Sequence, residues 1–272
     1  MSASRSPAIG LAEWRLPRSG EAALRLAARA GADGVQVEFG GGSRGEWADA
    51  PGRISALREA AAATGVKLLA VAGNVLNDLG LPAPPGGPEE ARVRRVLVRL
   101  LDAAIGLGVP LAFVPSFRRG AIDGPVAFDR TARMLAWAAT EAEARGVVLA
   151  NENVLPPAGA RALVEAVASP AFRLVLDTFN PVDAGLDPVR LVAEVAGAFA
   201  GQVHLKDGPP AVGDMPPLGA GSGRLDATLS AVSRHMRGVE ALVLENDYRD
   251  GRAGRIAADL AWARSAALRH GL

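Results

Sequence analysis

Short apolar runs alternate with longer amphipathic stretches along this chain, and the alternation repeats about eight times. The apolar runs lack a strict apolar–polar alternation, which is typical of parallel strands covered on both faces. Strands are expected at 9–11, 34–38, 68–72, 111–114, 147–151, 172–177, 202–206 and 241–245. Helices are expected at 19–30, 54–63, 88–107, 126–145, 159–168, 188–198, 226–236 and 252–269. This order predicts a parallel sheet built from strand–helix units.

The same glycine signal precedes four of the expected strands. Gly31, Gly65, Gly108 and Gly146 each stand between a helical stretch and an apolar run, where glycine commonly ends a helix. The 272 residues divided among eight units give 34 each, about the length of one strand–helix step. We therefore predict an α/β fold, a single (β/α)8 TIM barrel, that forms one domain over residues 1–272. The alternative is an open, doubly wound sheet, which usually carries a glycine-rich turn after its first strand; residues 12–15 read Ala-Glu-Trp-Arg instead.

Three of the connections that follow strands are long and rich in glycine and proline: 39–53, 73–87 and 207–225. Loops at the carboxyl ends of barrel strands form the active sites of TIM barrels. These three loops are therefore expected to form the walls of a pocket. Residues 219–223, with three glycines, do not follow the dinucleotide fingerprint, and we interpret them as a flexible segment.

Composition excludes several other classes of protein. Thirty basic and 29 acidic residues nearly cancel, so nothing favours a nucleic-acid partner or an anionic membrane. The absence of cysteine excludes disulfides and thiolate chemistry. No long uncharged apolar run predicts a membrane span, and the polar first residues do not resemble a signal peptide. A cytoplasmic protein with a small-molecule substrate is expected.

The expected ends of four consecutive strands carry residues that can bind a metal ion. They are Glu152, Asp177, His204 and Glu245. A lone acid at such a place is more often a helix cap or an ion-pair partner, and a lone histidine is more often structural. In a closed barrel, however, four neighbouring strand ends share one rim, so these side chains can converge. Three carboxylates and one imidazole suit Mn²⁺, Mg²⁺ or Co²⁺ better than a structural zinc ion, and a cation would relieve the repulsion among the three negative charges.

These four residues, together with the sequence His-Leu-Lys-Asp at 204–207, resemble the signature of the xylose isomerase-like TIM barrels. The group that the chain resembles most is the sugar phosphate isomerases/epimerases, with their ketose 3-epimerases, hydroxypyruvate isomerases and inosose dehydratases. The resemblance implies one divalent ion held by all four residues, Mn²⁺ first and Mg²⁺, Co²⁺ or Zn²⁺ as alternatives. It also implies that Glu152 and Glu245 are the catalytic acid–base pair, and it allows a homodimer or homotetramer.

The residues that surround this core differ from the family pattern. Asn180 stands where relatives often have histidine, and residues 218–221 read Leu-Gly-Ala-Gly where relatives often have Leu-Gly-Glu-Gly. Gly-Pro-Pro follows at 208–210, where relatives often carry a substrate-binding arginine. The expected metal core is therefore intact, while the substrate shell is altered. Candidate substrate-binding residues are Glu38, Asn74, Asn180, Lys206 and Asp207.

The predicted function is a metal-dependent isomerase or epimerase of a small ketose, a polyol-type ketone or its phosphate. The ion would polarise the substrate carbonyl and stabilise an enediolate, while Glu152 removes a proton and Glu245 returns one. The alternative is a dehydratase of an inosose-like cyclic ketone, which would share the first proton abstraction. A DNA-repair endonuclease of the same superfamily would need many histidine ligands, and the chain has three histidines. A non-catalytic binding barrel does not explain the intact ligand set.

Overall fold

The computed structural model describes residues 6–209 and 215–272. Its strands are hydrogen-bonded to their neighbours in the order β1-β2-β3-β4-β5-β6-β7-β8, which closes a barrel. The strands are β1 (Ala8–Ala12), β2 (Gly34–Glu38), β3 (Lys67–Ala72), β4 (Leu111–Pro115), β5 (Val148–Glu152), β6 (Phe172–Asp177), β7 (Phe199–Leu205) and β8 (Ala241–Leu244). The predicted (β/α)8 barrel is thus confirmed, and the open sheet is excluded.

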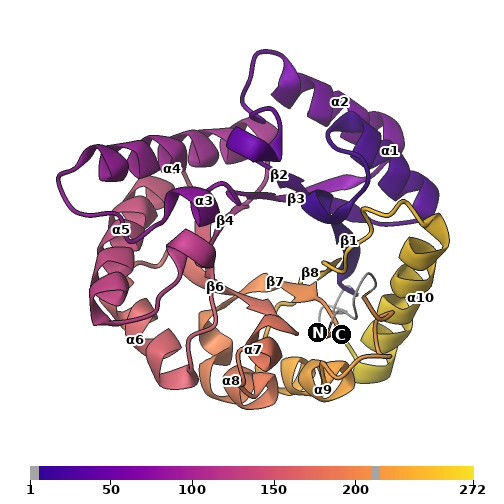
Figure 1. The fold of residues 1–272 in the computed structure, drawn as a ribbon. Coiled ribbons are helices and arrows are strands. Elements are labelled where there is room, and N and C mark those ends of the chain that lie inside the picture. Colours follow the sequence, from indigo (N-terminus) through magenta and orange to yellow (C-terminus); the bar gives the residue numbers. More distant parts are fainter. Residues whose placement is uncertain (1–5, 210–214) are drawn as a thin grey trace. The chain divides into compact units, whose positions relative to one another are not determined.

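Helices follow the strands, as Figure 1 shows. They are α1 (Glu21–Ala30), α2 (Arg53–Thr64), α3 (Leu76–Leu79), α4 (Pro88–Leu107), α5 (Pro125–Glu143), α6 (Pro157–Val167), α7 (Asn180–Asp183), α8 (Pro188–Val195), α9 (Leu225–His235) and α10 (Ala253–His270). The described residues also form the 3₁₀ turns η1 (Glu13–Arg15), η2 (Gly42–Arg44), η3 (Arg118–Gly120) and η4 (Ala196–Ala198). The sequence did not predict α3, α7, η1, η2 or η3, because single turns inside loops are too short to show an apolar period.

The glycine signals before β2, β3, β4 and β5 act as expected. Gly31 and Gly108 cap α1 and α4 in the left-handed conformation. Gly65 and Gly146 also have positive φ angles, of 73° and 66°. Glycine adopts this conformation without steric cost, which is why a helix can stop there and turn into a buried strand.

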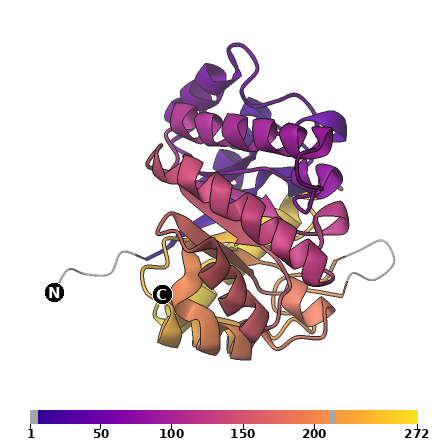
Figure 2. The same cartoon turned by 90° about the vertical axis from the view of Figure 1, so that its left-hand side faces the viewer.

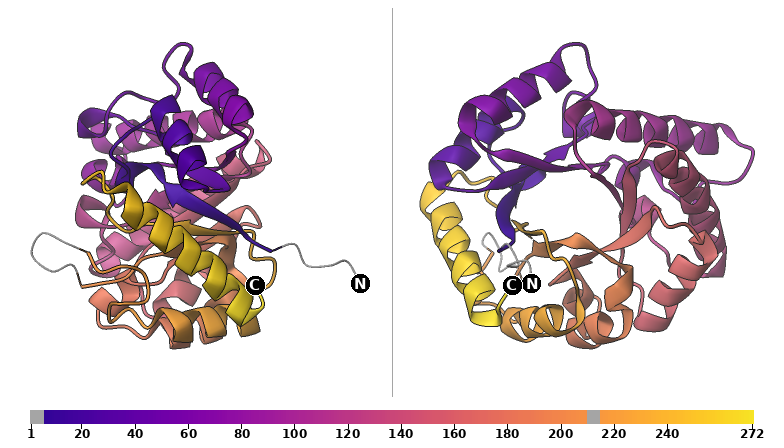
Figure 3. Two further views of the ribbon diagram at one scale, coloured as in Figure 1. Left: turned by 90° about the vertical axis from the view of Figure 1, so that its right-hand side faces the viewer. Right: turned by 180° about the vertical axis from the view of Figure 1, so that it is seen from behind.

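The contacts divide the chain into two compact units. The first comprises residues 6–36, 60–67 and 176–272 without 210–214, and the second comprises 37–59 and 68–175. In the first unit, β8 pairs in parallel with β1 and β7, and α10 packs on α1, α9, β1 and β8 (Figure 3, left). In the second unit, β4 pairs with β5, and α5 packs between α4 and α6 (Figure 2). A single domain over the whole chain stays a prediction.

The apolar strand residues form the core. Most residues of β4 and β8 are fully buried, as are the inward faces of α4 and α5. Burial of a Val or Leu side chain stabilises the fold by about 1.5–3 kcal/mol, so these runs fix the strands and thereby the residues at their ends. Within the described part of the chain, no helix has both the length and the apolar character needed to cross a bilayer.

Candidate metal centre

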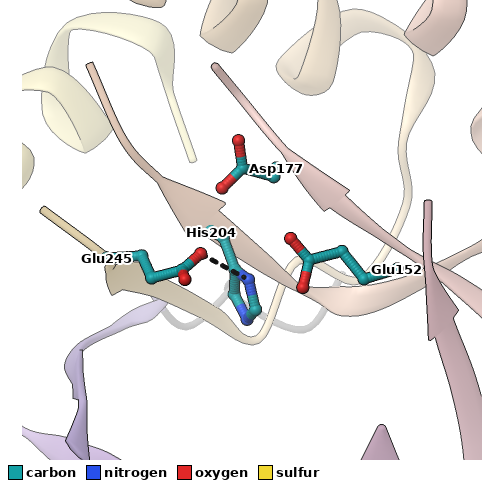
Figure 4. A group of neighbouring side chains, drawn as sticks. All are labelled: Glu152, Asp177, His204 and Glu245. Atoms are coloured by element: carbon teal, nitrogen blue, oxygen red, sulfur yellow. Dashed lines mark ion pairs between the residues drawn. The ribbon is translucent and has the colours of Figure 1, made fainter. Parts of the chain in front are cut away.

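Four side chains that can bind a metal ion converge at the carboxyl ends of β5 to β8. Glu152 ends β5, Asp177 ends β6, His204 precedes the last residue of β7, and Glu245 follows β8. All four are buried, with at most 5% of their surface exposed. Each offers one ligand atom, and these atoms all lie within 4.8 Å of one another (Figure 4). The structure therefore brings together the four residues that the sequence singled out as ligands.

The turn after β6 orients Asp177. Its Oδ1 accepts hydrogen bonds from the backbone N–H groups of Phe179, at 2.8 Å, and Asn180, at 2.5 Å. Two donors on one oxygen fix the plane of the carboxylate. This leaves Oδ2 as the oxygen that can act as a ligand.

Two buried glutamines, Gln36 of β2 and Gln202 of β7, orient His204. Gln36 of β2 donates its side-chain N–H to Oε1 of Gln202, 2.9 Å away. Its own Oε1 therefore faces the Nε2 of His204, also at 2.9 Å. An amide oxygen can only accept, so Nε2 carries the proton and Nδ1 holds the lone pair. Such a partner behind a histidine fixes the tautomer that metal binding needs.

Glu245 is held by the turn after β1. Its Oε1 accepts hydrogen bonds from the Trp14 indole N–H, at 2.9 Å, and from Nε and Nη2 of Arg15, at 3.2 and 3.1 Å. Burial alone would raise the pKa of Glu245, but the charge of Arg15 holds that pKa well below its usual range. Glu245 is therefore a carboxylate at neutral pH.

The remaining oxygen of Glu245 supports a cation at this place. Oε2 is buried and accepts no hydrogen bond from the described residues, and it lies 3.3 Å from Nδ1 of His204. When Nε2 carries the only imidazole proton, two lone pairs face each other there, and a cation between them would turn this repulsion into attraction. The donor set of three carboxylates and one imidazole fits a divalent ion.

Removal of the glutamine behind His204 tests this arrangement. We expect Gln36→Leu to weaken Mn²⁺ binding by about 10–100-fold, because the imidazole loses the acceptor that fixes its tautomer and orientation. Isothermal titration calorimetry on the metal-free protein measures the change. Gln36→Glu is the matched variant, since a carboxylate still accepts from Nε2, and it should bind Mn²⁺ at least as well as Gln36→Leu. Wild-type affinity in Gln36→Leu would refute the role of this hydrogen bond.

Two of the predicted substrate-binding residues lie together beside the ligands. Lys206 follows β7 directly, and its ammonium group donates to Oδ1 of Asn180, 2.8 Å away. Both side chains are partly exposed, and no ion pair to Lys206 is found among the described residues. Within the described part of the chain, Lys206 acts on a carboxylate only at a distance, by helping to lower the pKa of Glu245.

The other predicted substrate-binding residues have different surroundings. In the second unit, Asn74 donates to Oε2 of Glu38 at 2.8 Å, and Oε1 of Glu38 accepts from the N–H of Gly40. In the first unit, Asp207 is 1% exposed, and its carboxylate accepts from the backbone of the glycine-rich segment that was expected to be flexible. Contact of any of them with substrate stays a prediction.

Sequence reasoning missed Arg15, Gln36 and Gln202, as well as the hydrogen bond of Trp14 to Glu245. Gln36 and Gln202 left a signal, because a polar residue inside an otherwise apolar strand needs a buried partner. Gln202 also stands two residues before His204 and thus on the same strand face. Trp14 and Arg15 gave no signal of this kind, since their contacts with Glu245 join residues more than 200 positions apart.

Comparison with known proteins agrees with this geometry. The family model of the xylose isomerase-like TIM barrels matches residues 24–266, and the chain belongs to this family. It is 59% identical over 260 residues to 2-epi-5-epi-valiolone 7-phosphate 2-epimerase of Actinoplanes sp. strain SE50/110, covering 96% of this chain and 94% of that protein. The predicted class of enzyme, an isomerase or epimerase, is thereby confirmed.

Solved structures share the fold at low sequence identity. L-ribulose 3-epimerase superposes with a TM-score of 0.79 at 19% identity, covering 97% of this chain and 95% of the other. The IOLI protein, whose structure contains a bound zinc atom, superposes with a TM-score of 0.76 at 16% identity, covering 97% and 99%. At this identity the likeness concerns the barrel alone.

Proposed function

We propose that this protein is a divalent-metal-dependent epimerase of a polyol-type ketone phosphate, with inversion at the carbon next to the carbonyl. The observation that carries the proposal is the buried group of Glu152, Asp177, His204 and Glu245 at the strand ends. The 59% identical relative, whose name specifies the 2-epimerisation of a ketone 7-phosphate, supports the choice of substrate class. Mn²⁺ is the proposed ion, with Mg²⁺, Co²⁺ and Zn²⁺ as alternatives, since this donor set accepts all four.

The two glutamates would move the proton. When bound, the ion would polarise the ketone and stabilise the negative charge that develops on its oxygen. Glu152 removes the proton from the adjacent carbon, and Glu245, after taking up a proton from solvent in the substrate complex, delivers it to the same carbon from the opposite face. In the reverse direction the two carboxylates exchange roles. Trp14 and Arg15 keep the Glu245 carboxylate in place through its Oε1.

Lys206 is proposed to bind the phosphate of the substrate. Its ammonium group has three donors, of which Asn180 uses one, and no carboxylate among the described residues neutralises it by contact. A phosphate oxygen would accept a charge-assisted hydrogen bond from such a group. Asn180, Glu38 and Asn74 are proposed to contact hydroxyl groups of the substrate.

Replacement of Lys206 by methionine separates phosphate binding from catalysis. A hydrogen bond to a charged group contributes about 1.5–3 kcal/mol, so KM for the ketone phosphate should rise by roughly 10–150-fold. KM for the same ketone without phosphate should change little, and Lys206→Arg should retain most of the phosphate preference. Steady-state kinetics on the two substrates measures the effect. An equal loss on both would contradict phosphate recognition by Lys206.

Solvent deuterium incorporation tests the proposed reaction. The protein, loaded with Mn²⁺, is incubated in D₂O with 2-epi-5-epi-valiolone 7-phosphate, with ketose phosphates and with inososes. Mass spectrometry and NMR after removal of the metal should show one deuterium at the carbon next to the carbonyl, together with the inverted epimer. Incorporation with loss of water would favour the dehydratase. No incorporation in any compound would refute proton abstraction next to a carbonyl.

The other expectations from the sequence stay predictions. They are a cytoplasmic location, a homodimer or homotetramer, and the absence of nucleic-acid and membrane partners.

A further inference from the structure

The carboxylate of Asp207 accepts hydrogen bonds from the backbone of Gly208 and of the glycine-rich segment 219–223. Oδ1 accepts from the N–H groups of Gly208, at 2.9 Å, and Gly223, at 2.8 Å. Oδ2 accepts from Gly219, at 2.9 Å, and Gly221, at 3.0 Å. Four donors occupy both oxygens of a carboxylate that is buried within the protein, so its hydrogen-bonding capacity is used by the backbone.

The glycines around Asp207 are required by close contacts. A Cβ atom at position 223 would lie 2.6 Å from Oδ1 of Asp207, and one at position 221 would overlap the same carboxylate. At position 208 a Cβ atom would overlap the ring of Phe179. The segment is therefore packed on both Asp207 and Phe179, which is not what its glycine content alone suggested.

Phe179 connects this packing to a candidate metal ligand, Asp177. Its ring is buried against Gly208 and Gly223, while its backbone N–H, with that of Asn180, holds Oδ1 of Asp177. A continuous set of contacts thus runs from Asp207 through the glycines to Phe179 and on to the Asp177 carboxylate.

We propose that Asp207 is a positioning residue, which sets the orientation of the ligand Asp177 through the glycine-rich segment and Phe179. Asp207 then acts on metal binding without touching the ion or the substrate. The inference rests on the metal site of the proposed function but not on the identity of the substrate.

Asp207→Asn is the direct test. The amide has the same shape, but its NH₂ group can only donate. Two of the four glycine N–H groups would then face another donor and would lose their hydrogen-bond acceptor. We expect the affinity for Mn²⁺, measured by calorimetry on the metal-free protein, to fall about 10–100-fold, as is typical when a group that orients a metal ligand is lost. Phe179→Leu removes part of the packing against Gly208 and Gly223 and should also lower the affinity for Mn²⁺. This variant tests the same set of contacts if Asp207→Asn does not fold.

Asp33→Asn is the matched control for stability. Asp33 precedes β2, at the opposite ends of the strands, and accepts from the Ile9 N–H and from Arg264. This variant should lower the melting temperature of the metal-free protein and leave Mn²⁺ affinity unchanged. Unchanged affinity in a folded Asp207→Asn protein, or an equal loss in Asp33→Asn, would overturn the positioning role. Failure of the wild type to bind Mn²⁺ would overturn the metal site itself.

Discussion

Glu152→Gln is expected to lower kcat by about 10²–10⁴-fold, the usual contribution of a positioned general base. Glu152 ends β5 and is 4% exposed, and its backbone oxygen accepts from Ser116 across the paired strands. The strand therefore holds the position of this residue independently of its side chain. Glutamine retains the shape and an oxygen ligand, but it cannot accept the substrate proton at neutral pH.

Kinetics at saturating Mn²⁺ measures this loss, and the metal content of the variant is determined beside it. Deuterium incorporation should fall with turnover, because both need the same proton abstraction. Glu165→Gln is the matched control, since Glu165 lies exposed on α6 and should leave kcat unchanged. A Glu152→Gln protein with near wild-type turnover would exclude Glu152 as the base.

Removal of the metal is expected to abolish both turnover and deuterium incorporation. The physical reason is that the buried carboxylates would lose the cation that balances their charge, and the developing oxyanion would lose its stabilising partner. The folded state should also become less stable: an ion present at 100 times its Kd contributes about 2.7 kcal/mol, which corresponds to a melting temperature lower by roughly 5–10 °C in its absence.

Chelation followed by addition of single metals measures both effects. Activity and melting temperature should return with Mn²⁺, and comparison with Mg²⁺, Co²⁺ and Zn²⁺ ranks the ions. Asp177→Asn is the control for specificity, because its melting temperature should respond much less to added metal. Full activity in demonstrably metal-free protein would refute metal dependence.

The fold could be predicted from the chain because its signals are local. A glycine with positive φ ends a helix wherever the backbone must turn, and Gly31, Gly65, Gly108 and Gly146 mark four such places. Apolar runs of strand length then alternate with helices, and this order leaves few topologies. One-turn elements such as α3 and α7 escaped prediction because they bury too little apolar surface to leave a pattern.

The four candidate ligands could also be predicted from the sequence. A strand end is a defined place in a barrel, so the sequence alone assigns Glu152, Asp177, His204 and Glu245 to one rim. What holds these side chains in place depends on contacts across long stretches of chain, and the tertiary structure alone decided it. Arg15 donates hydrogen bonds to Glu245, 230 positions away in the sequence, and Gln36 accepts one from His204, 168 positions away. Asp207 accepts hydrogen bonds from N–H groups up to 16 residues away. Hydrogen bonds of this kind depend on where folded segments meet, and residue type and spacing do not encode that position.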